Sequence, residues 1–408
     1  MRLVVKIGTS SLTDERGVID DAVIARLCDQ IAAVRAAGHE VVLVTSGAVS
    51  AGVSALGLAE RPSDLPTLQA LAALGQPRLM ERYSAQFARH SLVAGQALVI
   101  PPNFVNRRQY LHARQTLVRL LELGCVPIVN ENDAIASDEI RWGDNDRIAA
   151  LVSHLVAADL LVLLTDTPGL YTADPRSDPN AALIPFVAHD DPLLAVDAGR
   201  SGSNRGSGGM ASKLAAARIA SWSGVRAVIA LASSDHVLEV AVRDDHSAGT
   251  TFEAHDRRLP ARKLWIAFAA APAGTIRVDD GATTALVDGH RSLLHAGVRS
   301  VSGHFDEGDT VEIAGPDGPW FARGMTLTDA ATARRAAGRR SVDLPSNVSA
   351  ELVHRDDLVI LLAERARADS RTARRPGAGP VSPRQAWLLR RSRGRGAVEA
   401  ELGPQPDN

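Results

Sequence analysis

The segment Val4-Val5-Lys6-Ile7-Gly8-Thr9-Ser10-Ser11 is the most informative stretch of this chain. A β-branched apolar run leads into a lysine, a glycine and three hydroxyl side chains, which is typical of a strand that ends at a polar turn. Backbone turns of this kind bind anions, and a lysine at the end of the strand adds a positive charge. The segment therefore predicts a phosphate site at the end of the first strand.

A second glycine-rich segment with a lysine lies far downstream, at Gly206-Ser207-Gly208-Gly209-Met210-Ala211-Ser212-Lys213. Glycines let backbone amides approach an anion closely, and the segment directly precedes a predicted helix. Neither segment contains the string G-x-x-x-x-G-K-[ST], so neither is a P-loop. Two separate lysines beside small-residue loops predict a phosphoryl group bound from two sides, in a kinase fold without a P-loop.

Residues 1–255 alternate between strand-like and helix-like segments. The predicted strands are Leu3–Ile7, Glu40–Thr45, Ala94–Ile100, Val126–Val129, Asp159–Leu164 and Val225–Leu231, and the main predicted helices are Asp20–Ala37, Thr67–Arg89, Tyr110–Leu123, Asn145–Val156 and Gly209–Ser223. This alternation of apolar strands with helices predicts an α/β fold with a mainly parallel sheet, whose ligands bind beyond the carboxyl ends of the strands. We expect four polar residues to lie just past such ends: Lys6, Ser46, Asn130 and Thr165.

The pattern changes after residue 255. Residues 256–272 are predicted to be a linker, and the short strand-like segments and turn signals over 273–363 predict a small β-rich domain. The tail, residues 364–408, contains ten arginines and is rich in Pro, Gly, Ser and Ala, so we expect it to be disordered. Its one apolar cluster, Trp387-Leu388-Leu389, leaves a short partner-binding motif open as an alternative.

Composition excludes several classes of protein. The formal net charge is −2, which argues against a protein devoted to nucleic acid. No apolar run approaches the ~18 residues that predict a membrane helix, and no basic segment followed by an apolar one predicts a secretion signal. Cys28 and Cys125 cannot form a disulfide framework, so we expect two buried thiols and a reducing cytoplasm.

The densest polar clusters are Asn130-Glu131-Asn132-Asp133 and Gly143-Asp144-Asn145-Asp146. Asparagine side chains both donate and accept hydrogen bonds, so such clusters suit a substrate with a carboxylate and an ammonium, that is, an amino acid. We expect Asp133 to bind the ammonium and Asn145 to donate to a carboxylate. Asp144 has an equally good alternative role as a helix cap.

Phosphoryl transfer needs alignment and charge neutralisation more than covalent help from the protein. We therefore expect Lys6 and Lys213 to bind phosphate oxygens, with Asp146 as the carboxylate that holds both ammonium groups. Residues 165–171, which follow a predicted strand, form either a nucleotide-facing turn or a structural β-turn. The string T-S-G at residues 45–47 is not G-x-S-x-G, so a serine hydrolase is poorly supported.

Six motifs resemble those of the glutamate 5-kinases, a branch of the amino acid kinase family, and they occur in the order found there. They are V-V-K-I-G-T-S (Val4–Ser10), V-T-S-G-A (Val44–Ala48), V-N-E-N-D-A (Val129–Ala134), G-D-N-D (Gly143–Asp146), L-T-D-T-P-G-L-Y-T-A-D-P (Leu164–Pro175) and G-G-M-A-S-K (Gly208–Lys213). The segment A-G-T-I-R-V-D-D-G-A at Ala273–Ala282 resembles a PUA domain, a small β-rich module.

This resemblance implies an αβα sandwich followed by a PUA-like domain. It implies transfer of a phosphoryl group from ATP, with Mg²⁺, to the γ-carboxylate of L-glutamate, which gives γ-glutamyl phosphate in the first step of proline biosynthesis. It further implies feedback inhibition by proline and a homo-oligomer, either a dimer or a tetramer. No membrane association is expected, because no apolar run is long enough to cross a bilayer.

The resemblance also carries roles for individual residues. Lys6, Lys213 and Asp146 resemble the catalytic groups, and Ser46, Asp133 and Asn145 resemble the glutamate contacts. The residues that resemble ATP contacts are Lys6, Thr165, Asp166, Ser207, Gly208, Gly209, Met210, Ala211, Ser212 and Lys213.

Two other functions compete with this interpretation. One is another amino-acid or carbamate kinase of the same fold, but the N-E-N-D and G-D-N-D pair and the appended β-rich domain favour glutamate. The other is an RNA-binding or RNA-modifying protein that acts through the second domain. That region lacks a dense basic stripe interleaved with aromatics, so we do not expect nucleic acid as the main partner.

Overall fold

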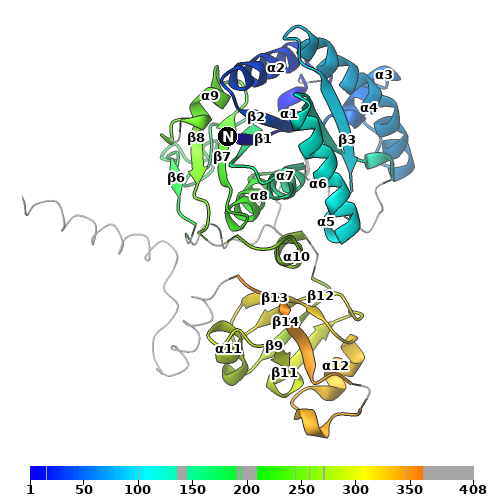
Figure 1. The fold of residues 1–408 in the computed structure, drawn as a ribbon, viewed down its shortest axis with the longest axis vertical. Coiled ribbons are helices and arrows are strands. Elements are labelled where there is room, and N and C mark those ends of the chain that lie inside the picture. Colours follow the sequence, from blue (N-terminus) through cyan, green and yellow to red (C-terminus); the bar gives the residue numbers. More distant parts are fainter. Residues whose placement is uncertain are drawn as a thin grey trace, which may run out of the picture.

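The computed structural model describes residues 1–361 with short gaps. The gaps are residues 15, 101, 136–144, 190, 192–193, 195–208, 244, 257, 270–271 and 347. The predicted tail over 364–408 therefore lies outside the described residues. The described chain forms a large α/β part and a smaller β-rich part, with helix α10 (Ala261–Leu264) between them (Figure 1).

An eight-stranded sheet runs through the α/β part in the order β3-β4-β2-β1-β5-β7-β8-β6. Its strands are β1 (Arg2–Ile7), β2 (Glu40–Val44), β3 (Ala94–Val99), β4 (Val126–Glu131), β5 (Leu160–Thr165), β6 (Phe186–Val187), β7 (Arg226–Leu231) and β8 (Gly249–Phe252). All neighbouring strands pair in parallel except β7 and β8, which are antiparallel. The predicted, mainly parallel sheet is thus confirmed.

Strand β1 shows why both faces of this sheet are covered by helices. Val4 belongs to one buried cluster, and Leu3, Val5 and Ile7 belong to the other, because alternate side chains of a strand point to opposite faces. By the same alternation Lys6 shares the face of Val4. The side chain of Lys6 is therefore directed to the layer of helices that packs on that face.

The two helical layers complete an αβα sandwich. The layer on the Val4 face contains α6 (Arg107–Glu122), α7 (Asn145–Leu155) and α8 (Met210–Trp222), while the opposite layer contains α2 (Asp21–Ala36), α3 (Ala48–Ala55), α4 (Leu65–Ala88) and α9 (Val237–Val242) (Figure 1). Two short helices, α1 (Thr9–Leu12) and α5 (Pro102–Val105), follow β1 and β3. None of the helices in the described residues is both long and apolar enough to cross a membrane.

Local sequence signals set the ends of the main helices. The Asp20 carboxylate accepts a hydrogen bond from the Ala22 amide at 2.8 Å and so caps α2, and Asn106 caps α6 in the same way. Gly38 and Gly124, which follow α2 and α6, have φ angles of 88° and 77°. Glycine adopts this left-handed conformation without steric cost, so both predicted helix ends are confirmed.

The strand ends differ from the prediction. Lys6, Asn130 and Thr165 lie within the last residues of β1, β4 and β5, and of the four polar residues only Ser46 follows its strand. Their backbones still pair, since Asn130 is opposite Leu98, and strand pairing does not require an apolar side chain. The prediction of two buried thiols is also wrong for Cys125, which is only half-buried at the turn before β4, whereas Cys28 is buried.

The β-rich part has its own six-stranded sheet, in the order β10-β14-β13-β12-β9-β11. Its elements are β9 (Gly274–Val278), α11 (Asp280–Val287), β10 (Leu293–Leu294), β11 (Val298–Gly303), β12 (Thr310–Ala314), β13 (Trp320–Thr326), α12 (Ala330–Ala336) and β14 (Glu351–Ile360). A separate apolar cluster that includes Ile276, Val311 and Phe321 fills it. The predicted β-rich second part is confirmed.

Helices α3 and α4 approach so closely that only glycine fits between them. A Cβ atom on Gly75 would lie 1.8 Å from the Ala48 carbonyl oxygen, and one on Gly52 would lie 2.0 Å from the Leu71 carbonyl oxygen. The sequence did not predict α3, because eight residues with an internal glycine show too little periodicity. This close contact holds α3, the helix that follows β2, against α4.

We predict that Gly75→Ala lowers the free energy of unfolding by about 1–3 kcal/mol, because the added methyl group forces the two helices apart. Urea unfolding of the full chain measures this change. Ser84→Ala, at an exposed position of α4, is the control and is expected to leave stability nearly unchanged. Equal stability of the two variants would contradict the tight contact.

Candidate active site

A buried carboxylate lies between two ammonium groups at the carboxyl end of β1. Asp146 Oδ1 is 2.6 Å from Lys6 Nζ, and Asp146 Oδ2 is 3.2 Å from Lys213 Nζ. The Ser212 hydroxyl donates a hydrogen bond to Oδ2 at 3.0 Å. The Asp146 side chain is fully buried, and those of the two lysines are 5% and 7% exposed. Residues from three distant segments thus form one ion cluster.

The fold explains how these residues meet. Lys6 points from β1 toward the layer of α7 and α8, and those helices pack against each other. Asp146 lies in the first turn of α7 and Lys213 in the first turn of α8. A carboxylate near a helix N-terminus also interacts favourably with the helix dipole. A Cβ atom on Gly8 would lie 3.2 Å from Lys6 Nζ, so this glycine keeps the space beside the ammonium open.

The cluster carries one net positive charge. Burial alone would raise the pKa of the Asp146 carboxyl, but the ammonium groups of Lys6 and Lys213 outweigh burial and hold this pKa below its ordinary value. Asp146 is therefore ionised at neutral pH, and two ammonium groups face one carboxylate. A buried site of this charge attracts an anion.

The start of α8 adds donors for an anion. Gly209 is the N-cap and offers no side-chain acceptor to the first amides of the helix. Met210 and Ala211 lie in this first turn, next to Ser212 and Lys213. Free amides at a helix N-terminus bind phosphate groups well. The predicted residues Ser207 and Gly208, like Asp144, lie outside the described residues.

Asn145, directly before Asp146, begins a second polar network. Its Nδ2 lies 2.9 Å from the Thr45 carbonyl oxygen, 2.7 Å from Ser46 Oγ and 3.0 Å from Asn130 Oδ1. Asn130 Nδ2 in turn donates to Gln76 Oε1 at 2.8 Å. The structure thus joins Asn145 to Ser46, two residues that the sequence analysis expects to contact the substrate, and places this network one residue from the ion cluster.

Gln76 was missed by the sequence analysis. It is a polar residue on the buried face of α4, which also carries Leu79, Tyr83 and Phe87 at helical spacing. A glutamine on an apolar face is the signal that identifies it. Gln76 Nε2 and Asn145 Oδ1 are buried and have no hydrogen-bond partner among the described residues. The network therefore retains one donor and one acceptor.

Asp133 lies in the 3₁₀ turn η1 (Asp133–Ile135), three residues after Asn130. No hydrogen bond within the described chain joins it to Ser46 or Asn145. Burial raises the pKa of the Asp133 carboxyl to about 6, and the charge of Arg61 opposes the shift only in part. The carboxyl group therefore changes its charge in mildly acidic solution.

Thr165 and Asp166 lie together at the end of β5, which pairs directly with β1. The Thr165 hydroxyl donates to Asp166 Oδ1 at 3.0 Å. Thr165 is buried, whereas Asp166 is exposed. These two residues are thus beside the strand that carries Lys6 and on the same edge of the sheet.

Comparisons with known proteins find relatives for both parts of the chain. Residues 1–230 match the model of the amino acid kinase family, and residues 274–346 match that of the PUA domain. The glutamate 5-kinase of Mycobacterium ulcerans is 46% identical over 88% of this chain and 96% of its own length. The glutamate 5-kinase of Mycobacterium tuberculosis is 46% identical over 90% of this chain and 96% of its own length.

We predict that Asp146→Ala lowers the free energy of unfolding by about 3–5 kcal/mol, because it leaves two buried ammonium groups without their carboxylate. Chemical denaturation at neutral pH measures the loss. The exposed Asp235→Ala serves as control and is expected to change stability by less than about 0.5 kcal/mol. A loss no larger than that of the control would mean that the two lysines do not depend on Asp146.

Proposed function

Because the chain belongs to the amino acid kinase family, and within it to the glutamate 5-kinases, we propose that Lys6, Asp146 and Lys213 form its phosphoryl-transfer centre. The enzyme transfers the γ-phosphoryl group of ATP to the γ-carboxylate of L-glutamate. The products are ADP and γ-glutamyl phosphate, and the reaction is the first step of proline biosynthesis. The observation that carries the proposal is the buried Asp146 carboxylate, 2.6 and 3.2 Å from two ammonium groups.

Lysine usage in the whole chain supports this role. The chain has three lysines, Lys6, Lys213 and Lys263, and all its other basic residues are arginines or histidines. Lysine carries a compact ammonium that binds a phosphate oxygen as a point charge, whereas arginine carries a planar group. Two of the three lysines therefore occur where the proposed reaction requires a compact cation.

The chemistry needs no general base. The γ-carboxylate of glutamate is already ionised at neutral pH, so one of its oxygens attacks the γ-phosphorus directly. A new P–O bond forms, the bond from the γ-phosphorus to the β,γ-bridging oxygen breaks, and ADP leaves with those electrons. The main obstacle is repulsion between the two anions. Lys6 and Lys213 reduce this repulsion and stabilise the charge that is spread over the transferring group.

Glutamate would bind beside this centre. Ser46, Asn145 and Asp133 are assigned to glutamate binding, with Asp133 at the ammonium. Because Asn145 Nδ2 is already engaged by Thr45, Ser46 and Asn130, the Ser46 hydroxyl is the group that can donate to a carboxylate. The hydrogen bond between Asn145 Nδ2 and Ser46 Oγ supports a common role for these two residues. Asp133 comes from the turn after β4, so it would approach the substrate from another element.

The nucleotide would bind on the side of β5 and α8. Thr165 and Asp166 supply polar groups at the end of β5, and residues 209–213 supply the amides and side chains at the start of α8. The hydrogen bond between Ser212 and Asp146 connects this segment to the transfer centre.

Mg²⁺ is assigned to the nucleotide rather than to a protein cage. Among the described residues, no group of three or more His, Cys, Asp or Glu side chains suits a metal ion. Mg²⁺ is commonly held by phosphate oxygens with one or two carboxylates, so the donor set fits an ion that arrives with ATP. When bound, the ion would neutralise phosphate charge.

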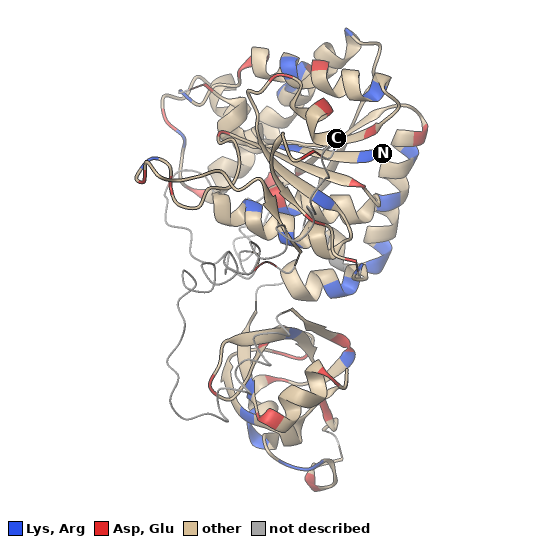
Figure 2. Ribbon diagram, turned by 90° about the vertical axis from the view of Figure 1, so that its left-hand side faces the viewer, with Lys and Arg blue, Asp and Glu red and all other residues tan. Residues whose placement is uncertain are grey.

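The remaining assignments, drawn partly from the resemblance and partly from composition and sequence pattern, stay predictions. They are feedback inhibition by proline, assembly into a dimer or tetramer, a cytoplasmic location, and domain bounds of 1–255, 256–272 and 273–363. Nucleic acid is not proposed as a substrate. In Figure 2, the ribbon of the β-rich part carries both acidic and basic residues.

We predict that Lys6→Ala and Lys213→Ala each lower kcat by about 10²–10³-fold, because each removes a cation from the transition state. The KM for glutamate is expected to change much less. ATP-dependent formation of glutamyl hydroxamate measures both, with aspartate, N-acetylglutamate and carbamate as competing acceptors. The exposed Arg243→Ala is the control. Unchanged kcat in either lysine variant would rule out its role, and preference for another acceptor would rule out glutamate.

We predict that the KM for glutamate rises as the pH falls through about 6, because Asp133 then gains a proton and loses its attraction for the substrate ammonium. The rise approaches tenfold per pH unit below that pKa. Asp133→Asn is expected to have a high KM already at pH 7.5 and to lack this pH dependence. If both proteins show the same slope between pH 5 and 7.5, Asp133 is not the titrating group.

A further inference from the structure

Helix α8 connects the lysine site to the β-rich part. Lys213 lies in its first turn, and Arg218 follows five residues later, about 7.5 Å along the axis at 1.5 Å per residue. The Arg218 guanidinium lies 5.3 Å from the ring centre of Phe268 and 5.9 Å from that of Trp320. Arg218 is only 9% exposed. One short helix therefore contacts Asp146 at one end and Trp320 of strand β13 further along.

Trp320 is held by a second guanidinium. Arg323, also on β13, lies 4.9 Å from the Trp320 ring centre. It is paired with Glu312 at 3.0 Å and donates to the Ala267 carbonyl oxygen at 3.0 Å. Cations are attracted to aromatic faces, most strongly to tryptophan and when shielded from water. The indole ring therefore contacts guanidinium groups from both parts, Arg323 of the β-rich part and Arg218 of α8.

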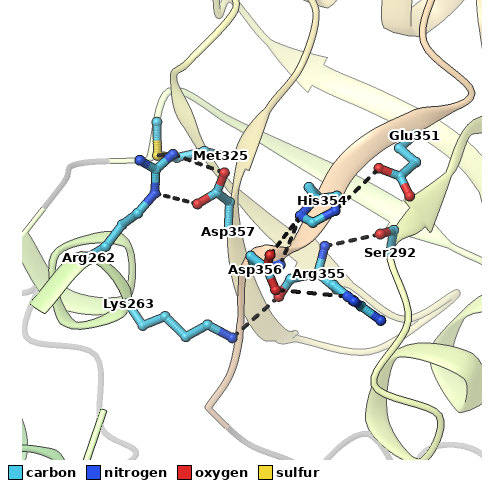
Figure 3. Close-up of polar contacts among 9 residues, drawn as sticks. All are labelled: Arg262, Lys263, Ser292, Met325, Glu351, His354, Arg355, Asp356 and Asp357. Atoms are coloured by element: carbon cyan, nitrogen blue, oxygen red, sulfur yellow. Dashed lines mark hydrogen bonds and ion pairs between the residues drawn. The ribbon is translucent and has the colours of Figure 1, made fainter. Parts of the chain in front are cut away.

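The chain segment between the two parts is not a free hinge. Arg262 on α10 forms a two-pronged ion pair with Asp357 of β14, with Nη2 2.9 Å from Oδ2, and Lys263 donates to the Arg355 carbonyl oxygen at 3.3 Å (Figure 3). The π-helical turn η4 (Trp265–Ala269) follows α10 and contributes Ile266 to the buried cluster of the α/β part. The connecting segment therefore binds the β-rich part on one side and the α/β part on the other.

We propose that the β-rich domain positions Lys213, and that Arg218 is the positioning residue through which it acts. Contact of Arg218 with Trp320 and Phe268 fixes the orientation of α8, and with it the Lys213 ammonium at the transferring phosphoryl group. The inference rests on the proposed role of Lys213. Displacement of a catalytic group by about 1 Å can cost up to about 10²-fold in rate, so support at a distance along the same helix affects turnover.

The chemistry of Arg218 suits this task. Its planar guanidinium can lie against two rings and remains charged, whereas a lysine ammonium is more strongly hydrated and lacks a flat face. Arg218→Lys therefore keeps the charge and weakens the contact. Trp320→Phe keeps a ring at the same place, and Trp320→Ala removes it. These three variants separate the stacking contact from charge and from bulk.

Steady-state hydroxamate assays on the full chain test the proposal. Trp320→Ala and Arg218→Lys are each expected to lower kcat about 3- to 30-fold, the range that one cation–π contact supplies. The KM for glutamate should stay within about twofold, because Ser46, Asp133 and Asn145 are not on α8. Trp320→Phe should retain most of the rate. The Arg218→Lys/Trp320→Ala double variant should be no slower than the slower single variant, since both changes remove one contact.

The exposed Arg243→Lys and Val342→Ala are the matched controls and should keep the wild-type kcat. The proposal would be overturned if the folded Trp320→Ala protein had the wild-type kcat. It would also be overturned if the reductions in kcat of the two single variants added up in the double variant, or if the KM for glutamate rose while kcat stayed unchanged. If Trp320→Ala does not fold, Arg218→Lys alone decides by the same criteria. A wild-type chain that is inactive with glutamate would instead contradict the proposed function.

Discussion

The ion pairs of Asp146 with Lys6 and Lys213 are the interaction on which the rest of the structure depends. Each of the three groups would be costly to bury alone, and together they are paired while one positive charge remains. The remaining positive charge favours the binding of an anion at this site. The central position of β1, between β2 and β5, is what allows one lysine to reach the first turns of two helices.

The same arrangement divides the site into two halves with different chemistry. The half on the side of α8 is cationic and rich in backbone donors, which suits phosphate. The other half combines amides and hydroxyls at the ends of β2 and β4 with the Asp133 carboxyl in the turn after β4, which suits the polar groups of an amino acid. Helix α7 contributes to both halves, through Asn145 and Asp146, whereas α8 contributes only to the cationic half.

Much of this could be predicted from the sequence, because the signals are local. The apolar residues around Lys6 predict the strand that carries it, and the glycines before Met210 mark the start of α8. The pairing of Asp146 with both lysines was expected because a carboxylate was needed near them. The hydrogen bonds of Asn130 and Gln76 were not expected, since they join residues 54 positions apart in the sequence and depend on how α4 packs.

The exact ends of the strands and the contacts of α8 could not be predicted from local sequence patterns either. Lys6, Asn130 and Thr165 remain in their strands because neighbouring strands pair with them, and a single segment does not reveal its neighbours. In the sequence, nothing distinguishes Arg218 from other helical arginines, because its contacts with Phe268 and Trp320 exist only in the folded chain. Long-range packing therefore determines the details that the local patterns leave open.

Asn145 and Asp146 are consecutive residues, and this has a consequence for how the two halves of the site can change. Their Cα atoms are about 3.8 Å apart in any conformation with a trans peptide, so a covalent spacer of constant length separates acceptor recognition from the transfer machinery. A change in the backbone position of Asn145 therefore also moves Asp146, so the groups that bind the acceptor and those that bind the phosphoryl group are mechanically coupled through α7.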